Sequence, residues 1–170
     1  ADPGGGITFV AVVDGALAGT ARLHRAGTYP VPLPGGSAGV RAVVVAPAYR
    51  RTGVASVLMA TCAERARAAG AAALYLHTAP FMTGAVALYD GLGYRRAPAT
   101  DLDVGAHFGA GSADAVVAPA YRHAGMHHDQ VALPLGLGRR ACGVIGDGVG
   151  PDAFPLRKLE GDRVIAEGRE

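Results

Sequence analysis

The stretch V-V-V-A-P-A-Y-R-R-T-G-V-A, residues Val43 to Ala55, decides the fold of this chain. It begins with consecutive β-branched residues, which are typical of a buried strand. Pro47 then ends the strand, because proline cannot donate to a sheet ladder. After two arginines and Gly53, apolar residues recur at helical spacing. The sequence therefore predicts a central strand over Val40–Val45, a basic glycine loop, and a helix over Gly53–Ala69.

The basic glycine loop has the properties of an anion site. The first turn of a helix leaves N–H groups unpaired, and the helix dipole favours negative charge there. Gly53 and Ala55 allow a ligand to approach the backbone closely, while Arg50 and Arg51 add charges that match phosphate oxygens. The phosphate loop of nucleotide triphosphatases and the pattern G-x-G-x-x-G are both absent. An ordinary, tightly packed strand-to-helix turn is the alternative interpretation.

The flanking segments predict alternating strands and helices. A hairpin turn is expected at Asp14-Gly15, a loop over Gly27–Gly39, and a second helix over Thr83–Gly91. The remaining predicted strands are Ile7–Val13, Ala16–Arg25, Ala71–Thr78, Tyr94–Val104 and Gln130–Leu137, with a small hairpin about Gly161-Asp162. This order predicts a mixed α/β sheet with parallel pairing at its centre.

A length of 170 residues fits one domain. We expect a flexible lead-in over residues 1–6, a domain over 7–137 with a loop insertion at 105–129, and an extension of unknown role over 138–170. The net charge of +2 is too small to indicate nucleic acid or a membrane surface. No apolar run is as long as a membrane span, and alanine, glycine, valine and arginine dominate. A soluble, cytoplasmic, bacterial protein is expected, with Cys62 and Cys142 as free thiols rather than a disulfide.

Two motifs in this order resemble those of the GNAT superfamily of acyl-CoA N-acyltransferases. R-R-T-G-V-A, from Arg50, resembles the signature [QR]-x-x-G-x-[GA], and A-V-A-L-Y-D-G-L-G-Y, Ala85–Tyr94, resembles A-x-x-L-Y-x-x-x-G-[FY]. The resemblance covers Ile7–Val104 and extends to the predicted closing strand. It implies a GNAT-like fold with an acyl-CoA, usually acetyl-CoA, bound in a splay between Val40–Val45 and Ala71–Thr78. It also implies direct transfer of an acetyl group to a primary amine of a small molecule or peptide.

The resemblance assigns roles to particular residues. Val43 and Val45 would offer backbone groups to the pantetheine arm of the donor. The pyrophosphate would be held by the loop residues Arg50, Arg51, Thr52, Gly53, Val54, Ala55 and Ser56. Tyr89 matches the tyrosine that the family commonly uses to protonate the departing thiolate, a transfer that a well-placed phenol can make. A core tyrosine on an apolar helix face is the alternative for Tyr89.

The chain departs from the family pattern at the expected general base. Many relatives carry a glutamate at a position that falls near Gly39, and no acid lies between Ala38 and Val45. His77 is the candidate base, because histidine titrates near neutral pH. The alternatives are a His77 held by sheet-edge hydrogen bonds, His24 as the base, or deprotonation by solvent. Met82 stands where relatives often carry an asparagine.

Further departures leave other questions open. The usual first strand and first two helices are expected to be lacking, so the identity of the acceptor amine is not predicted, and a homodimer is left open. A catalytically silent acyl-CoA-binding or regulatory module is the alternative function, and a protein acetyltransferase is a third. The heptapeptide V-V-A-P-A-Y-R recurs at Val116–Arg122, without a helix pattern after it. The cluster His123, His127, His128 and Asp129 fits a metal site, but a solvated loop near the acceptor is preferred.

Overall fold

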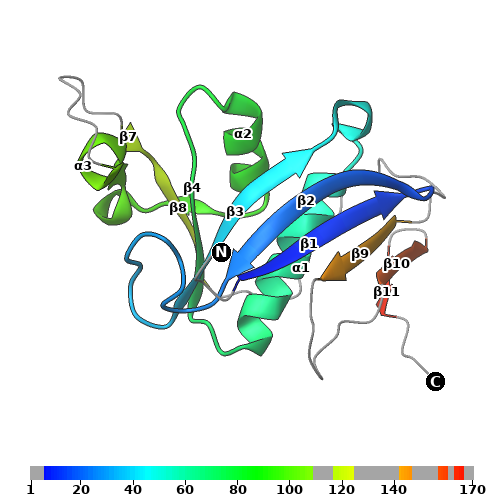
Figure 1. The fold of residues 1–170 in the computed structure, drawn as a ribbon, viewed down its shortest axis with the longest axis horizontal. Coiled ribbons are helices and arrows are strands. Elements are labelled where there is room, and N and C mark those ends of the chain that lie inside the picture. Colours follow the sequence, from blue (N-terminus) through cyan, green and yellow to red (C-terminus); the bar gives the residue numbers. More distant parts are fainter. Residues whose placement is uncertain (1–5, 109–116, 125–141, 147–156, 161–162, 167–170) are drawn as a thin grey trace.

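The computed structural model describes residues 6–108, 117–124, 142–146, 157–160 and 163–166. Within these ranges the main sheet has the strand order β5-β8-β4-β3-β2-β1-β9 (Figure 1). Its strands are β1 (Gly6–Val13), β2 (Ala16–His24), β3 (Ser37–Val45), β4 (Ala73–His77), β5 (Arg95–Arg96), β8 (Ala120–Ala124) and β9 (Cys142–Gly146). The β3–β4 pair is parallel and its neighbours are antiparallel, which confirms the predicted mixed sheet.

The first two strands form the predicted hairpin. Asp14 and Gly15 both have positive φ, 50° and 78°, as a two-residue turn with the twist of a hairpin requires. Along β1 every second residue is buried, and Phe9, Ala11 and Val13 form part of the core. A period of two places these three side chains on one face of the sheet.

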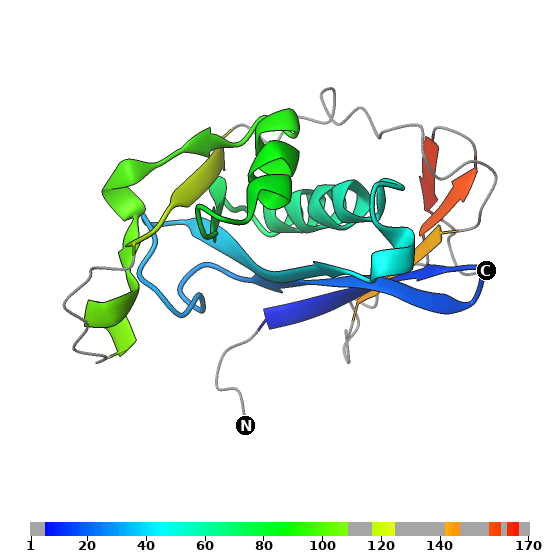
Figure 2. The same cartoon turned by 90° about the horizontal axis from the view of Figure 1, so that it is seen from above.

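Helix α1 (Val54–Ala68) packs against β1, β2, β3 and β4. It ends as predicted, since Gly70 has φ 80° and the arginines of the last turn, Arg65 and Arg67, suit the helix dipole. Helix α2 (Thr83–Gly91) follows β4. Figure 2 shows α1 and α2 on the same side of strands β1, β2 and β3. The core lies between this face and the helices.

A β-bulge divides β3 into two halves. Thr20 pairs with Val44 but Arg22 pairs with Arg41, so β3 contains one extra residue at this point. Ala42 has φ 52°, which is uncommon for a residue other than glycine. The parallel pairing with β4 ends just before the bulge, at Val40 opposite Leu76. The outer half of β3 therefore has no strand on its β4 side among the described residues.

The prediction of one strand over Tyr94–Val104 was wrong. The segment forms the short strand β5, a 3-10 turn η2 (Pro98–Thr100), the strand β6 (Leu102–Asp103) and the start of α3 (Val104–Phe108). Pro98 begins the turn because its ring fixes φ and removes the N–H that a ladder needs. Another 3-10 turn, η1 (Pro47–Tyr49), follows β3 for the same reason.

The prediction of a loop over Gly105–Asp129 was also wrong in part. Its described residues include α3, the strand β7 (Val117–Ala118), which pairs with β6, and β8, which pairs with β4 in the main sheet. The predicted strand Gln130–Leu137 lies outside the described residues. The small hairpin is confirmed as β10 (Arg157–Glu160) and β11 (Arg163–Ala166).

Candidate functional site

The turn from β3 into α1 leaves a series of backbone amides open. Arg51 has φ 65° and Gly53 has φ 93°, so the chain reverses direction here and enters the helix at Val54. The first hydrogen bond of α1 runs from the Val57 amide to the Gly53 carbonyl, 3.1 Å away. In the described part of the chain, no amide from Arg51 to Ser56 donates to a backbone carbonyl. These amides are available to an anion, as the sequence predicts.

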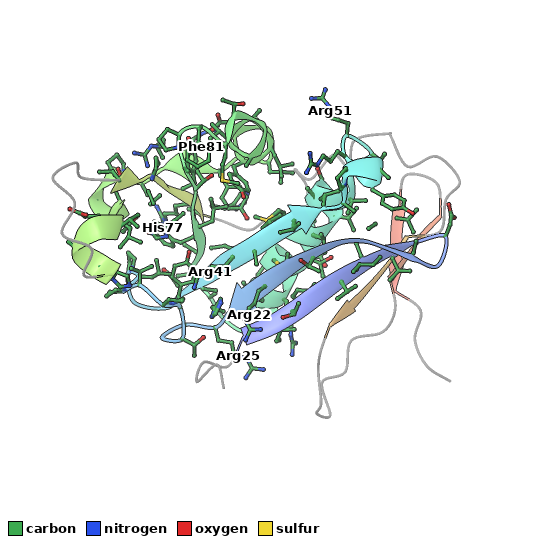
Figure 3. The ribbon with its side chains drawn as sticks, turned by 45° about the horizontal axis from the view of Figure 1, so that its top comes forward. Arg22, Arg25, Arg41, Arg51, His77 and Phe81 are labelled. Atoms are coloured by element: carbon green, nitrogen blue, oxygen red, sulfur yellow. The ribbon has the colours of Figure 1, made fainter. Side chains whose placement is uncertain are left out.

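Buried and hydrogen-bonded side chains stabilise the turn, whereas its two arginines are exposed. The Thr52 hydroxyl donates to the Tyr49 carbonyl at 2.7 Å, and Val54 and Ser56 are buried. Arg50 and Arg51 are exposed, and Figure 3 shows Arg51 projecting away from the body of the molecule. No acidic residue lies in the first turn of α1 to compete for these charges.

The outer half of β3 borders this turn. Val43 and Val45 are partly buried and pack against the core, whereas the Val44 side chain between them is 58% exposed. The Arg50 Nε donates to the Val45 carbonyl at 3.4 Å, so this carbonyl lies on the side of β3 that faces the turn. The structure therefore brings the residues that were predicted to bind the acyl-CoA together at one end of β3.

Tyr89 is the only buried residue of α2 and is 6% exposed. Its ring packs at 5.9 Å from the Tyr94 ring and 6.2 Å from the Tyr121 ring. No hydrogen bond of its hydroxyl is found among the described residues, and burial raises the pKa of Tyr89 above its usual value of 10.0. A tyrosine in this state is both a core residue, as the alternative interpretation has it, and a phenol that stays protonated at neutral pH.

His77, the last residue of β4, has both ring nitrogens bonded. Its Nε2 lies 2.8 Å from the Thr100 carbonyl oxygen and its Nδ1 lies 3.2 Å from the Tyr29 hydroxyl. The carbonyl can only accept, so Nε2 carries the hydrogen and the Nδ1 of neutral His77 accepts from Tyr29. Hydrogen bonding of His77, one of the alternatives, is therefore present, and the lone pair that a base needs faces Tyr29.

Tyr29, in the loop between β2 and β3, was missed by sequence reasoning. Its ring covers Gly39, where a β-carbon would stand 2.0 Å from the Tyr29 Cδ2. Burial raises the pKa of Tyr29 to about 12, Arg41 lowers this pKa, and Tyr89 raises it. Tyr29 is thus bonded to one predicted catalytic residue and lies within electrostatic range of the other. The only signal in the sequence was the absent side chain at position 39.

The Thr100 carbonyl is held in place by an ion pair at the next residue. Asp101 receives the Arg96 guanidinium at 2.7 and 2.8 Å, and its Oδ1 also accepts the Ala120 amide at 2.7 Å. These contacts lower the pKa of Asp101, with the Arg96 hydrogen bond as the largest cause. Together they attach η2 to β8 and hold the Thr100 carbonyl that accepts the hydrogen bond from the His77 Nε2.

The remaining predicted candidates have contacts of their own. His24 is buried and its Nδ1 lies 3.1 Å from the Thr28 carbonyl oxygen, while Met82 accepts a hydrogen bond from Thr78. His123 packs edge-on against Tyr94, and its predicted partners at 127–129 lie outside the described residues. Within the described residues no group of three or more His, Cys, Asp or Glu side chains forms a metal site.

Two further findings concern the thiols and the helices. Cys62 is a free, fully buried thiol, and burial raises its pKa. No helix in the described part of the chain combines the length and the apolar character needed to cross a membrane.

Comparison with solved structures shows the fold. A Bacillus subtilis acetyltransferase in complex with CoA has a TM-score of 0.56 and 18% identity, over 70% of this chain and 76% of that chain. A provisionally named streptothricin acetyltransferase of Bacillus anthracis, in complex with acetyl coenzyme A, has a TM-score of 0.58 and 18% identity, over 71% and 63%. A GCN5-related N-acetyltransferase from Kribbella flavida has a TM-score of 0.52 and 27% identity, over 70% and 67%.

Sequence comparison agrees with the fold. No curated protein sequence matches the chain significantly. The model of the acetyltransferase (GNAT) family matches residues 1–94, which is more than half of the chain and includes the β3–α1 turn, His77 and Tyr89. The chain therefore belongs to the acetyltransferase (GNAT) family of N-acetyltransferases.

Proposed function

We propose that the chain transfers the acetyl group of acetyl-CoA to a primary amine of a small molecule or a peptide by direct attack on the thioester. Acetyl-CoA is the co-substrate of the family, and CoA or acetyl-CoA is bound in two of the structural neighbours. The observation that carries the proposal is the outer half of β3, which among the described residues has no strand on its β4 side, beside the open amides of the β3–α1 turn.

The donor would bind along this edge. The backbone of Val43 and Val45 would pair with the amides of the pantetheine arm, as a neighbouring strand would. The pyrophosphate would lie against the amides between Arg51 and Ser56, where the helix dipole favours its charge. Arg50 would exchange its weak bond to the Val45 carbonyl for a phosphate oxygen, which is a stronger, charge-assisted bond.

The reaction needs two proton transfers. The amine nitrogen attacks the thioester carbon, the C–S bond breaks, and CoA leaves as a thiolate. Tyr89 would give its phenolic proton to that thiolate, since a buried and therefore protonated phenol is a suitable general acid. His77, with its neutral Nδ1, would take up the proton that the amine loses.

A silent acyl-CoA-binding module is the second candidate. Two observations favour it: Gly39 provides no carboxylate, and both nitrogens of His77 already have partners. Calorimetry with acetyl-CoA, paired with a thiol-release assay across a panel of amines, separates the two functions. Binding with turnover of at least one amine is expected, and mass spectrometry of the product identifies the acceptor. Binding without turnover for any amine would favour the silent module.

A further inference from the structure

Tyr29 is held on three sides near the point where β3 and β4 diverge. Its ring lies on Gly39, stacks on the His77 ring at 5.8 Å with an angle of 24°, and meets the His24 ring edge-on at 5.6 Å. Gly39 is in the last paired part of β3, opposite Tyr75 of β4, one residue before the pairing ends. The ring is therefore positioned by packing, although it belongs to a loop.

The donor and the acceptor are fixed in both hydrogen bonds of the neutral His77 ring. Thr100 supplies a carbonyl, so His77 donates there through Nε2, and Tyr29 donates its hydroxyl proton to Nδ1. The proton that reaches the Nδ1 lone pair along this bond is the hydroxyl proton of Tyr29 itself. Any acceptor amine that His77 deprotonates through Nδ1 must then deliver its proton to the Tyr29 oxygen.

We propose that Tyr29 is a catalytic residue that touches the acceptor amine and relays its proton to His77. As the amine attacks the thioester, one N–H bond breaks and its proton forms an O–H bond with Tyr29. In the same step the original Tyr29 proton passes to His77 Nδ1, which leaves neutral Tyr29 and an imidazolium. The proposal rests on the proposed function, and it replaces the missing carboxylate near Gly39 with a phenol and an imidazole.

The charges around the pair suit this transfer. Arg41 of β3 favours the transient negative charge on the Tyr29 oxygen, whereas Tyr89 of α2 disfavours it. Asp101 lies beside the carbonyl that accepts the His77 Nε2–H, and an electrostatic interaction with His77 contributes to the lowered pKa of Asp101. His24 of β2 lies against the Tyr29 ring. The concerted relay avoids a free phenolate, which burial makes costly.

Tyr29→Phe tests the relay, because it keeps the ring on Gly39 and His77 and removes only the hydroxyl. We expect kcat to fall about 100-fold or more, the usual contribution of a general base, with acetyl-CoA affinity unchanged by calorimetry. Tyr75→Phe is the matched control on β4 and should keep wild-type kcat. A wild type that does not bind acetyl-CoA, or that binds it and acetylates no amine, overturns the proposed function, whereas wild-type kcat in Tyr29→Phe overturns the relay alone.

A second measurement does not depend on turnover. Nitrogen NMR of protein with ¹⁵N-labelled histidine should show His77 with hydrogen on Nε2, and its Nδ1 resonance should shift in Tyr29→Phe but not in Tyr75→Phe. His77→Gln keeps a donor for the Thr100 carbonyl and cannot store a proton, so its kcat should fall as far as that of Tyr29→Phe. The double variant should be no slower than either single variant. If the losses in kcat of the two single variants multiplied in the double variant, the two residues would not act as one relay.

Discussion

The Tyr29 ring occupies the space that a β-carbon on residue 39 would need, with the ring atom Cδ2 2.0 Å from that point. Gly39→Ala must therefore displace the ring and weaken its bond to His77. We expect a loss of about 1–3 kcal/mol in the free energy of unfolding, as for other overpacked sites. Denaturant unfolding measures the loss, and Gly35→Ala is the control, since nothing lies within 4 Å of its β-carbon. A Gly39→Ala protein as stable as this control would contradict the packing described.

Gly53→Glu should abolish acetyl-CoA binding, because it places a carboxylate where the proposed site holds the pyrophosphate. A loss of at least about 100-fold in affinity is expected from opposing charge and lost contacts. Gly70→Glu is the matched control at the other end of α1. It has the same added charge and a similar positive φ, 80° against 93°. Calorimetry of both variants makes the comparison, and equal affinities would refute the assignment of the turn.

Tyr89→Phe should lower kcat more than it changes donor affinity, since the hydroxyl would act on the thiolate only in the transition state. A reduction of about 100-fold is the usual scale for a general acid. Because burial raises the pKa of Tyr89, loss of the wild-type rate from Tyr89 ionisation should begin at a higher pH than for an ordinary tyrosine of pKa about 10. Steady-state kinetics across the alkaline pH range give both results, and unchanged kcat in Tyr89→Phe would remove the role.

Asp101→Asn should loosen the Thr100 carbonyl, which accepts the hydrogen bond from the His77 Nε2. The bidentate bond to Arg96 is lost, and we expect about 1 kcal/mol of destabilisation at neutral pH. The folded-state pKa of Asp101 is lowered, so its contribution is present above the unfolded value near 3.8 and is lost as pH falls through the lower folded value. Thermal unfolding against pH should therefore show a smaller acid loss in Asp101→Asn than in wild type. Parallel curves would contradict this.

Much of the fold was predictable because strong local signals agree with it. Pro47, Gly53 and Gly70 mark a strand end, a helix start and a helix end, and the structure confirms all three. The bulge at Ala42 was not predictable, since alanine has no preference for positive φ. It is imposed by pairing with β2, where the Thr20 hydroxyl also donates to the Ala42 carbonyl.

The repeated heptapeptide shows why local sequence is not enough. In the first copy Tyr49 lies in the 3-10 turn η1, whereas in the second copy Tyr121 lies in β8, paired with Leu76 of β4. An open edge of β4 was available to the second copy, and tertiary pairing outweighed the identical local preference. The Tyr29–His77 bond was hidden for a similar reason, because loop packing on Gly39 joins residues far apart in the sequence.

The pairing of β9 with β1 also affects how the protein is made. Val13 lies opposite Cys142 and Phe9 opposite Gly146, so the sheet joins an early and a late part of the polypeptide. During synthesis the outer edge of β1 must wait, with its backbone groups unpaired, until β9 has emerged from the ribosome. Closing so long a loop slows folding, and an exposed strand edge invites pairing with other chains. Aggregation during expression should therefore arise at β1, before β9 has been synthesised.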